Sequence, residues 1–304
     1  MNSRKITSLL AAMLAVILCL GAATVSLADN AAPQAQNMEL ETFRDVSVGG
    51  RLTAVDPEGD PVTFQITTQP VKGAVALETD GSFVYTPASG KKGKDYFGYK
   101  ALDTQGNLSQ EGTVIIKINR QKAAVTYSDM TGSGDYYAAV MLAKNGVFTG
   151  EKVGGTYLFC PEASVTRGEF LSMCMEVADT SLLAGVMSTG FEDDAQIPDW
   201  EKPYVSTAVM NGGVCGYAGT FGSVFCANTP ITQAEASVML NKAAGLTDVA
   251  VTGGDSAEPA WAAQSVANLR AQNIPTGGTA MTSALTRAKA AEMLLKAMEA
   301  IKAK

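Results

Sequence analysis

Two arginines occupy the same place in a motif that occurs three times in the C-terminal half of the chain. The copies are Val165-Thr166-Arg167-Gly168-Glu169, Ile231-Thr232-Gln233-Ala234-Glu235 and Leu285-Thr286-Arg287-Ala288-Lys289. A guanidinium at the start of a helix offers a carboxylate two parallel hydrogen bonds, and free N–H groups there also attract anions. The pattern predicts carboxylate binding at Arg167 and Arg287, or else solvated first-turn side chains. Gln233 carries no charge, so we expect its copy to be weak or inactive.

Several classes of function are disfavoured by composition. The chain contains no histidine, which removes serine–histidine and cysteine–histidine catalysis and the commonest metal ligand. A formal net charge of −7 disfavours nucleic-acid binding, which needs a basic surface. Paired carboxylates could still serve a glycosidase. The β-rich region of about 80 residues is too small to leave much room for a catalytic cleft, and the repeats of the C-terminal half take up the rest, so we expect a protein that is not an enzyme and has no cofactor.

The first 28 residues have the pattern of a secretory signal peptide. Arg4 and Lys5 precede an apolar run from Leu9 to Ala23, and Ser26 and Ala28 are small residues at cleavage positions. Cleavage after Ala28 would change the net charge from −7 to −9. No later stretch is long and apolar enough to span a membrane. We therefore expect secretion, with residues 29–37 forming a polar, Ala/Pro-rich tether.

Residues 38–119 alternate apolar and polar side chains with a period of two. Val114, Ile116 and Ile118 are one such run, and clusters of Gly, Asp and Pro separate the runs. This pattern predicts a small all-β sandwich. Four acids in its loops could gather around a calcium ion or could act only as turn formers, which we favour. They are Asp56, Glu58, Asp60 and Asp103.

Beyond a linker at 120–126, the period becomes helical and the sequence repeats. We assign repeat 1 to residues 127–183, repeat 2 to 190–246 and repeat 3 to 250–304. Thr166, Thr232 and Thr286 are expected to cap a helix in each copy. Glu169 and Glu235 complete capping boxes, whereas Lys289 breaks the third and should weaken that helix start. One helix pair cannot bury its apolar face alone, so three pairs should share an all-α core.

Four cysteines follow the leader, and their spacing matches no zinc motif. An exported protein permits disulfides, and the preferred pairing within each repeat is Cys160–Cys174 and Cys215–Cys226. Each bond would contribute roughly 3 kcal/mol through loop closure. The alternative is four buried free thiols, which pack well as small apolar groups.

The three repeats resemble S-layer homology repeats. The resemblance rests on an opening acid, an aromatic, a glycine-rich loop and the Thr-Arg-Ala-Glu helix start, in order over residues 127–300. It implies a pseudo-threefold helical bundle that holds an exported protein on a secondary cell-wall polysaccharide, often one carrying a pyruvate ketal. Matched position by position, it implies polymer binding by Arg167 and Arg287 and by the acids and aromatics that open each copy. These are Asp129, Asp193 and Asp255, and Tyr136, Trp200 and Trp261; plain core packing is the alternative for the tryptophans.

The sandwich resembles bacterial cadherin-like or immunoglobulin-like modules. The resemblance is carried by Asp56-Pro57-Glu58-Gly59-Asp60, by Asp80 to Pro87, by Gly93 to Tyr99 and by Asp103. Together the two resemblances imply a non-catalytic protein of the cell wall or cell surface that displays a small module with an unknown ligand. An S-layer subunit or a protein-binding role for the repeats is the alternative, with a wall glycosidase as a lesser one.

Overall fold

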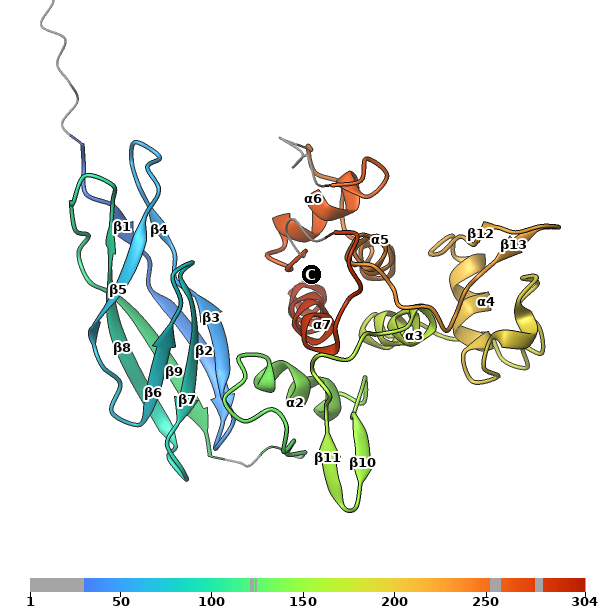
Figure 1. Ribbon diagram of the computed structural model, residues 1–304, viewed down its shortest axis with the longest axis horizontal. Helices are drawn as coiled ribbons and strands as arrows, with labels where there is room; N and C mark the ends of the chain where they lie inside the picture. The colour runs from blue at the N-terminus through green and yellow to red at the C-terminus, as the bar shows by residue number, and fades with distance from the viewer. Residues whose placement is uncertain (1–29, 121–122, 124, 252–257, 277–280, 304) are drawn as a thin grey trace, which may run out of the picture.

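The computed structural model describes residues 30–120, 123, 125–251, 258–276 and 281–303. The segment expected to be a signal peptide, residues 1–28, lies outside the described residues. The chain forms an N-terminal β-sandwich followed by a helical part, which confirms the multidomain prediction at that level (Figure 1). Within these ranges, no helix has both the length and the apolar character that a membrane span requires.

Two facing sheets make up the sandwich. The larger has the order β2-β9-β8-β5 and the smaller has the order β3-β7-β6. Neighbouring strands run antiparallel except β2 and β9, which run parallel. The strands are β2 (Met38–Phe43), β3 (Val48–Arg51), β5 (Thr63–Thr68), β6 (Gly73–Leu77), β7 (Ser82–Pro87), β8 (Gly93–Leu102) and β9 (Gly112–Asn119).

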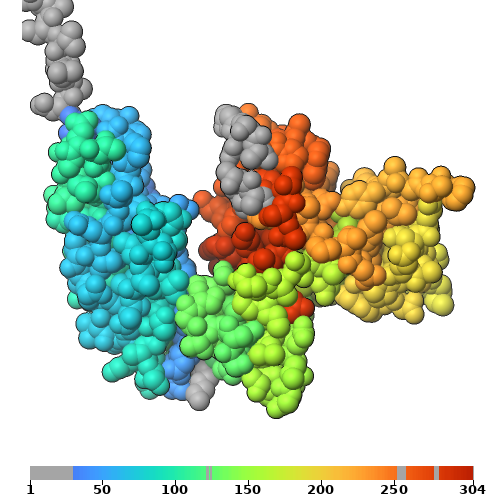
Figure 2. Space-filling model, viewed as in Figure 1, coloured from blue at the N-terminus to red at the C-terminus, as the bar shows by residue number. Residues whose placement is uncertain are grey.

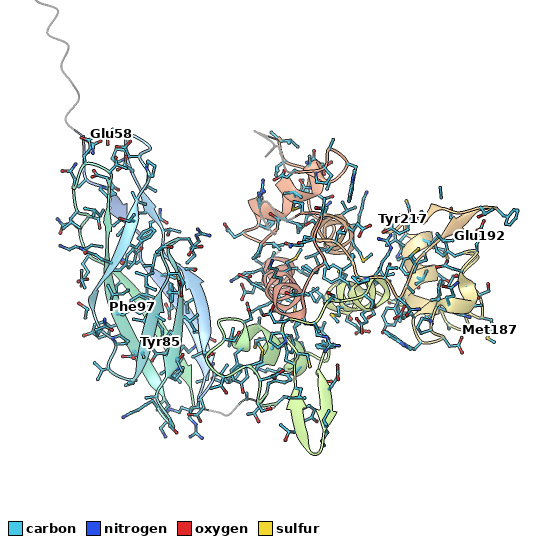
Figure 3. The ribbon with its side chains drawn as sticks, viewed as in Figure 1. Glu58, Tyr85, Phe97, Met187, Glu192 and Tyr217 are labelled. Atoms are coloured by element: carbon cyan, nitrogen blue, oxygen red, sulfur yellow. The ribbon has the colours of Figure 1, made fainter. Side chains whose placement is uncertain are left out.

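The period-two pattern produces the sandwich core. Val114, Ile116 and Ile118 all point inward from β9 and are at most 1% exposed. Phe83 and Phe97 meet edge to face between the sheets, with ring centroids 5.1 Å apart. Phe97 and Tyr85, both fully buried, are labelled within the sandwich in Figure 3. Alternate residues of β7 and β9 are therefore buried, as the sequence predicts, whereas β5 and β6 alternate between partly buried and exposed residues.

The segment expected to be a free tether instead belongs largely to the sandwich. Its strand β1 (Gln34–Ala35) pairs antiparallel with β4 (Ala54–Val55). Tyr99 Oη lies 2.6 Å from the carbonyl oxygen of Gln36, and Asn30 Nδ2 donates to Asp103. The Ala/Pro composition suggested a linker, but the backbone groups of these residues find partners along the sheet edge.

The helical part is built from helix pairs with short hairpins between them. Its helices are α2 (Tyr136–Lys144), α3 (Arg167–Val177), α4 (Lys202–Met210), α5 (Gln233–Ala244), α6 (Ala263–Ala271) and α7 (Arg287–Lys302), with the 3-10 turn η1 (Asp194–Gln196). The hairpins are β10 (Glu151–Val153) with β11 (Thr156–Leu158), and β12 (Tyr217–Ala218) with β13 (Ser223–Val224). The second helices α3, α5 and α7 lie at the centre (Figure 1).

The residues just before α3, α5 and α7 join in a closed ring of backbone hydrogen bonds. Val165 N donates to Leu285 O at 2.9 Å, Leu285 N to Ile231 O at 2.8 Å, and Ile231 N to Val165 O at 3.0 Å. Each first helix then packs on the second helix of the preceding copy in the cycle, as α4 does on α3, α6 on α5 and α2 on α7. Every repeat thus contacts both others, which explains how short helix pairs share one core.

Threonine caps begin the three central helices, as predicted. Thr166 and Glu169 form a complete capping box on α3, and Thr232 and Glu235 form one on α5. On α7, Thr286 accepts from the backbone N–H of Lys289 at 3.4 Å. A lysine side chain has no acceptor for the backbone N–H of Thr286, so α7 has only one of the two hydrogen bonds of a capping box.

The sandwich contacts the helical part through β3 and α2. Gly49 N donates to Gly134 O at 2.9 Å, and a Cβ on Gly49 would lie 3.1 Å from the Cα of Gly134, so the two backbones touch. Phe43 packs its ring 5.9 Å from that of Tyr137. Beside this contact, a cleft of about 1160 Å³ separates the sheet from α7, and Figure 2 shows the hollow between the two parts.

Candidate functional site: the junctions between repeats

The second helix of each copy begins against a loop of the next copy. We call these three places junction 1/2, junction 2/3 and junction 3/1. Backbone bonds define each: Arg167 N donates to Thr229 O, Gln233 N to Ser283 O, and Arg287 N to Ala163 O. The first residue of each central helix therefore faces the hairpin or loop of the following repeat in the cycle. The structure brings the two predicted arginines and Gln233 to equivalent positions.

Junction 1/2 encloses the guanidinium of Arg167 between two aromatic rings. Its Cζ lies 4.9 Å from the ring centroid of Tyr217 and 5.1 Å from that of Phe225, which is the geometry of a cation–π contact. Nη2 donates to the carbonyl oxygen of Cys215 at 2.9 Å. Nε is buried without a hydrogen-bond partner, and the residue is only 7% exposed. Arg167 is thus not a solvated first-turn side chain.

Junction 3/1 holds Arg287 in a similar place with a different partner. Its Cζ lies 5.2 Å from the ring centroid of Phe148, and Nη1 donates to the carbonyl oxygen of Phe159 at 3.3 Å. The same Nη1 forms an ion pair at 2.9 Å with Glu151 at the start of β10. A carboxylate from the chain itself therefore compensates this guanidinium.

Junction 2/3 has no cation at the equivalent helix position. Gln233 is 1% exposed, and its Nε2 donates to Ser283 Oγ at 2.8 Å. A neutral amide offers no fixed charge to an anion. The expected weakness of the Gln233 copy stays a prediction.

The opening acids hold the loops beneath the arginines. Asp129 accepts from the backbone N–H groups of Phe159 and Cys160, at 3.0 and 2.7 Å. Asp193 accepts from the corresponding groups of Phe225 and Cys226, at 2.8 and 2.7 Å. These carboxylates therefore position the loop, and their contact with a polymer stays a prediction. The third predicted acid, Asp255, lies outside the described residues.

These bonds also explain two unusual backbone conformations. Cys160 and Cys226 have φ angles of +55° and +60°, in the left-handed region that non-glycine residues rarely adopt. Asp129 and Asp193 accept from the N–H groups of these two cysteines and so stabilise the turn. The turn directs Phe159 and Phe225 toward the junction arginines. Arg287 contacts the carbonyl oxygen of Phe159, and Arg167 contacts the ring of Phe225.

The predicted aromatics divide into one buried and two exposed residues. Tyr136 is 4% exposed, and its hydroxyl lies within hydrogen-bonding distance of the backbone N and O of Tyr127. Its polymer-binding assignment is therefore corrected to core packing. Trp200 and Trp261 are 55% and 60% exposed, so the alternative of plain core packing does not hold for them. Both remain open to a ligand.

A buried carboxyl at junction 1/2 was missed by the sequence analysis. Glu201, directly after Trp200, is 3% exposed, and its Oε2 has no hydrogen-bond partner. Burial raises the pKa of Glu201 to about 7, and the nearby carboxylate of Glu169 adds to the shift. The carboxyl fits only because Gly168 lacks a side chain: a Cβ there would lie 1.8 Å from Glu201 Oε2.

All four cysteines of the described chain are free thiols, so neither predicted disulfide is formed. Cys174 is fully buried in α3, where burial raises the pKa of its thiol well above the ordinary range. Cys215 is exposed, and Cys160 and Cys226 are partly exposed, so the alternative of four buried thiols is also incomplete. The carbonyl oxygen of Cys215 accepts from Arg167 Nη2, so this exposed cysteine lies beside the guanidinium.

Three of the four acids considered for calcium, Asp56, Glu58 and Asp103, act as turn and loop acceptors. Asp56 Oδ1 accepts from the N–H groups of Glu58 and Asp60, at 3.1 and 3.0 Å. Asp103 accepts from Gln105 and Asn107 in the same way. Glu58 accepts from the N–H of Ala31. Across the described ranges, no group of three or more Asp, Glu, Cys or His side chains is placed to hold a metal ion.

Residues 30–120 match the bacterial cadherin-like domain. This region coincides with the sandwich, and the match confirms the cadherin-like part of the sequence analysis. Among curated proteins, no relative matches the chain.

Solved structures similar to this chain resemble it only weakly. The human protocadherin-24 EC1-2 structure is 18% identical with a TM-score of 0.24, over 29% of this chain and 45% of that one. The endo-fucoidan hydrolase MfFcnA4 of glycoside hydrolase family 107 is 17% identical with a TM-score of 0.24. That alignment covers 31% of this chain and 14% of the hydrolase, so the chain spans only a small part of that enzyme.

Proposed function

We propose that the helical part is a body of three S-layer-homology-like repeats that anchors an exported, non-catalytic protein to an acidic cell-wall polysaccharide. The observation that carries the proposal is Arg167, a guanidinium buried between two aromatic rings at a repeat junction without an ion pair in the described chain. The rings could contact sugar faces, and the guanidinium could meet a carboxylate substituent such as a pyruvate ketal.

The arrangement of the repeats supports the proposal independently of that residue. The closed ring of bonds among Val165, Ile231 and Leu285 gives the three copies equivalent surroundings, as a pseudo-threefold body requires. The junctions are therefore three versions of one potential site, with Arg167, Gln233 and Arg287 at the same helix position. A net charge of −7 cannot attract an anionic polymer in bulk, so binding depends on these few cations.

The β-sandwich is, in this proposal, the displayed module. Its packing against α2 through Gly49 and Gly134 holds it close to the anchor rather than at the end of a free tether. A contact of this kind fixes the direction in which the module faces from the wall. The ligand of the sandwich is not identified, and a solvent-exposed sheet face offers a surface on which a ligand could bind.

The proposal is tested by sedimentation of the purified protein with bacterial wall sacculi. We expect binding to intact sacculi, loss of binding after acid stripping of the secondary polymer, and release by denaturant alone. The variant Gln233→Arg supplies the missing cation at junction 2/3, so it should bind equally well or better. Equal binding to stripped sacculi would instead favour a protein or peptidoglycan partner, and no binding to either preparation would refute the anchor.

A further inference from the structure

The two arginine junctions differ at one structurally equivalent position. In the first hairpin, Glu151 begins β10 and pairs with Leu158, directly before Phe159. In the second, Tyr217 begins β12 and pairs with Val224, directly before Phe225. The residue that starts each hairpin therefore pairs with the residue directly before Phe159 or Phe225. Glu151 and Tyr217 occupy the same place relative to Arg287 and Arg167.

At junction 3/1 this position supplies a carboxylate. Glu151 Oε1 accepts from Arg287 Nη1 at 2.9 Å, where an acidic ligand would bind. The Glu151 side chain is 57% exposed and that of Arg287 is 13% exposed, so the acid approaches from the solvent side. Because Glu151 is more than half exposed, water weakens this ion pair, so a ligand could displace it at a modest cost.

At junction 1/2 the same position supplies an aromatic ring. Tyr217 covers Arg167 and is 40% exposed, and its hydroxyl hydrogen-bonds to the carboxylate of Glu235. That acid is thereby held by the tyrosine rather than paired with the guanidinium. Arg167 keeps a buried Nε with no acceptor and forms no ion pair within the part of the chain that is described. Arg167 helps to lower the pKa of the nearby Glu235 carboxyl, but no carboxylate contacts the guanidinium directly, so its place for a bidentate acid is unfilled within the described ranges.

We propose that the residue at the head of each hairpin decides which junction takes the ligand carboxylate. Glu151 acts as an internal competitor that occupies Arg287, whereas Arg167, with Tyr217 as its stacking cover, is the principal acceptor. The ligand class is a carboxylate carried on a sugar ring, because the site combines a guanidinium with aromatic surface. This inference rests on the proposed function and assigns unequal roles to its two arginine sites.

The test compares variants at the equivalent positions in the full protein. The probes are intact and stripped sacculi and a methyl hexoside carrying a 4,6-pyruvate ketal, with the hexoside lacking the ketal as control. Glu151→Gln should raise affinity roughly threefold over Glu162→Gln, an exposed acid in the nearby loop that controls for net charge. Tyr217→Glu should lower affinity about tenfold relative to Tyr217→Gln, which removes the ring without adding a competitor.

The possible outcomes separate this inference from the anchor itself. If wild-type protein binds neither intact sacculi nor the ketal sugar, both fail. If it binds but Glu151→Gln behaves as Glu162→Gln does, the competitor role is refuted while the anchor stands. Tyr217→Glu binding no more weakly than Tyr217→Gln would likewise overturn the assignment of Arg167. If Tyr217→Glu loses its helical circular dichroism signal, the comparison of Glu151→Gln with Glu162→Gln tests the inference by itself.

Discussion

Asp95 in the sandwich and Glu201 in the helical part are each 3% exposed, yet their surroundings are opposite. Asp95 accepts from the backbone N–H groups of Val71 and Lys72 and from the hydroxyl of Tyr85. Glu201 has one carboxylate oxygen with no partner, beside the carboxylate of Glu169. At equal burial, the ionised form of Asp95 therefore stabilises the sandwich, whereas the ionised form of Glu201 is unfavourable.

The difference appears as opposite pKa shifts. Burial alone would raise the pKa of Asp95, but its hydrogen bonds outweigh burial and the pKa falls below its ordinary value. Burial raises the pKa of Glu201 to about 7, with no donor to oppose it. The sandwich should therefore lose stability as the pH falls through the lowered pKa of Asp95. The helical part should instead lose stability as the pH rises from about 4.5 to about 7.

The largest effect is expected at Asp95. Asp95→Asn replaces one acceptor oxygen by an NH₂ group that faces donors, so the sandwich should lose about 3 kcal/mol of unfolding free energy. Glu78→Gln, at an exposed sandwich position, makes the same charge change as a control. Hydrogen exchange measured separately for the strands and the helices resolves the effect. A loss below that of the control would show that the Asp95 hydrogen bonds do not hold the sandwich.

A smaller effect is expected at the partner of Glu201. Gly168→Ala places a Cβ 1.8 Å from Glu201 Oε2, and the expected cost to the helical part is about 2 kcal/mol despite the better helix propensity of alanine. Combining it with Glu201→Ala reproduces the small pair of junction 2/3, Ala234 and Ala262. The double variant should recover most of the loss. Additive losses in this double-mutant cycle would show that the two residues do not compete for space.

The smallest effect depends on pH. Glu201→Gln removes the ionisation that disfavours the folded state, so it should stabilise the helical part by about 1–2 kcal/mol at pH 8. At pH 4.5 both forms are neutral and the difference should be small. Thermal unfolding followed by helical circular dichroism at the two pH values measures it. A Glu201→Gln variant equally stabilised at both pH values would contradict the raised pKa.

Features encoded within single elements could be predicted from the sequence. The alternation of Val114, Ile116 and Ile118 predicted their burial, and the spacing of Thr166 and Thr232 from their glutamates predicted two capping boxes. These features depend on neighbours a few residues apart. They are retained in the folded structure because tertiary packing in the sandwich and the helical part favours the same local conformations.

Features that depend on pairs from different repeats could not be predicted in the same way. Gly168 and Glu201 compensate each other across a junction, and Glu151 reaches an arginine 136 residues away. One signal was present: copy 1 has Gly168 where the others have Ala234 and Ala288, and only copy 2 has an acid after its aromatic. Tyr136 was misassigned because its hydroxyl finds backbone partners at Tyr127, whereas the tryptophans at the same position stay exposed.

Binding isotherms on intact sacculi for the wild type, Arg167→Ala and Arg167→Lys test the central claim most directly. Both variants should bind at least about tenfold more weakly, because lysine keeps the charge but cannot form two parallel hydrogen bonds to a carboxylate. Hydrogen exchange across α3 confirms that each variant remains folded. Wild-type affinity in a folded Arg167→Ala variant would contradict the assignment of Arg167 as the residue that grips the wall polymer.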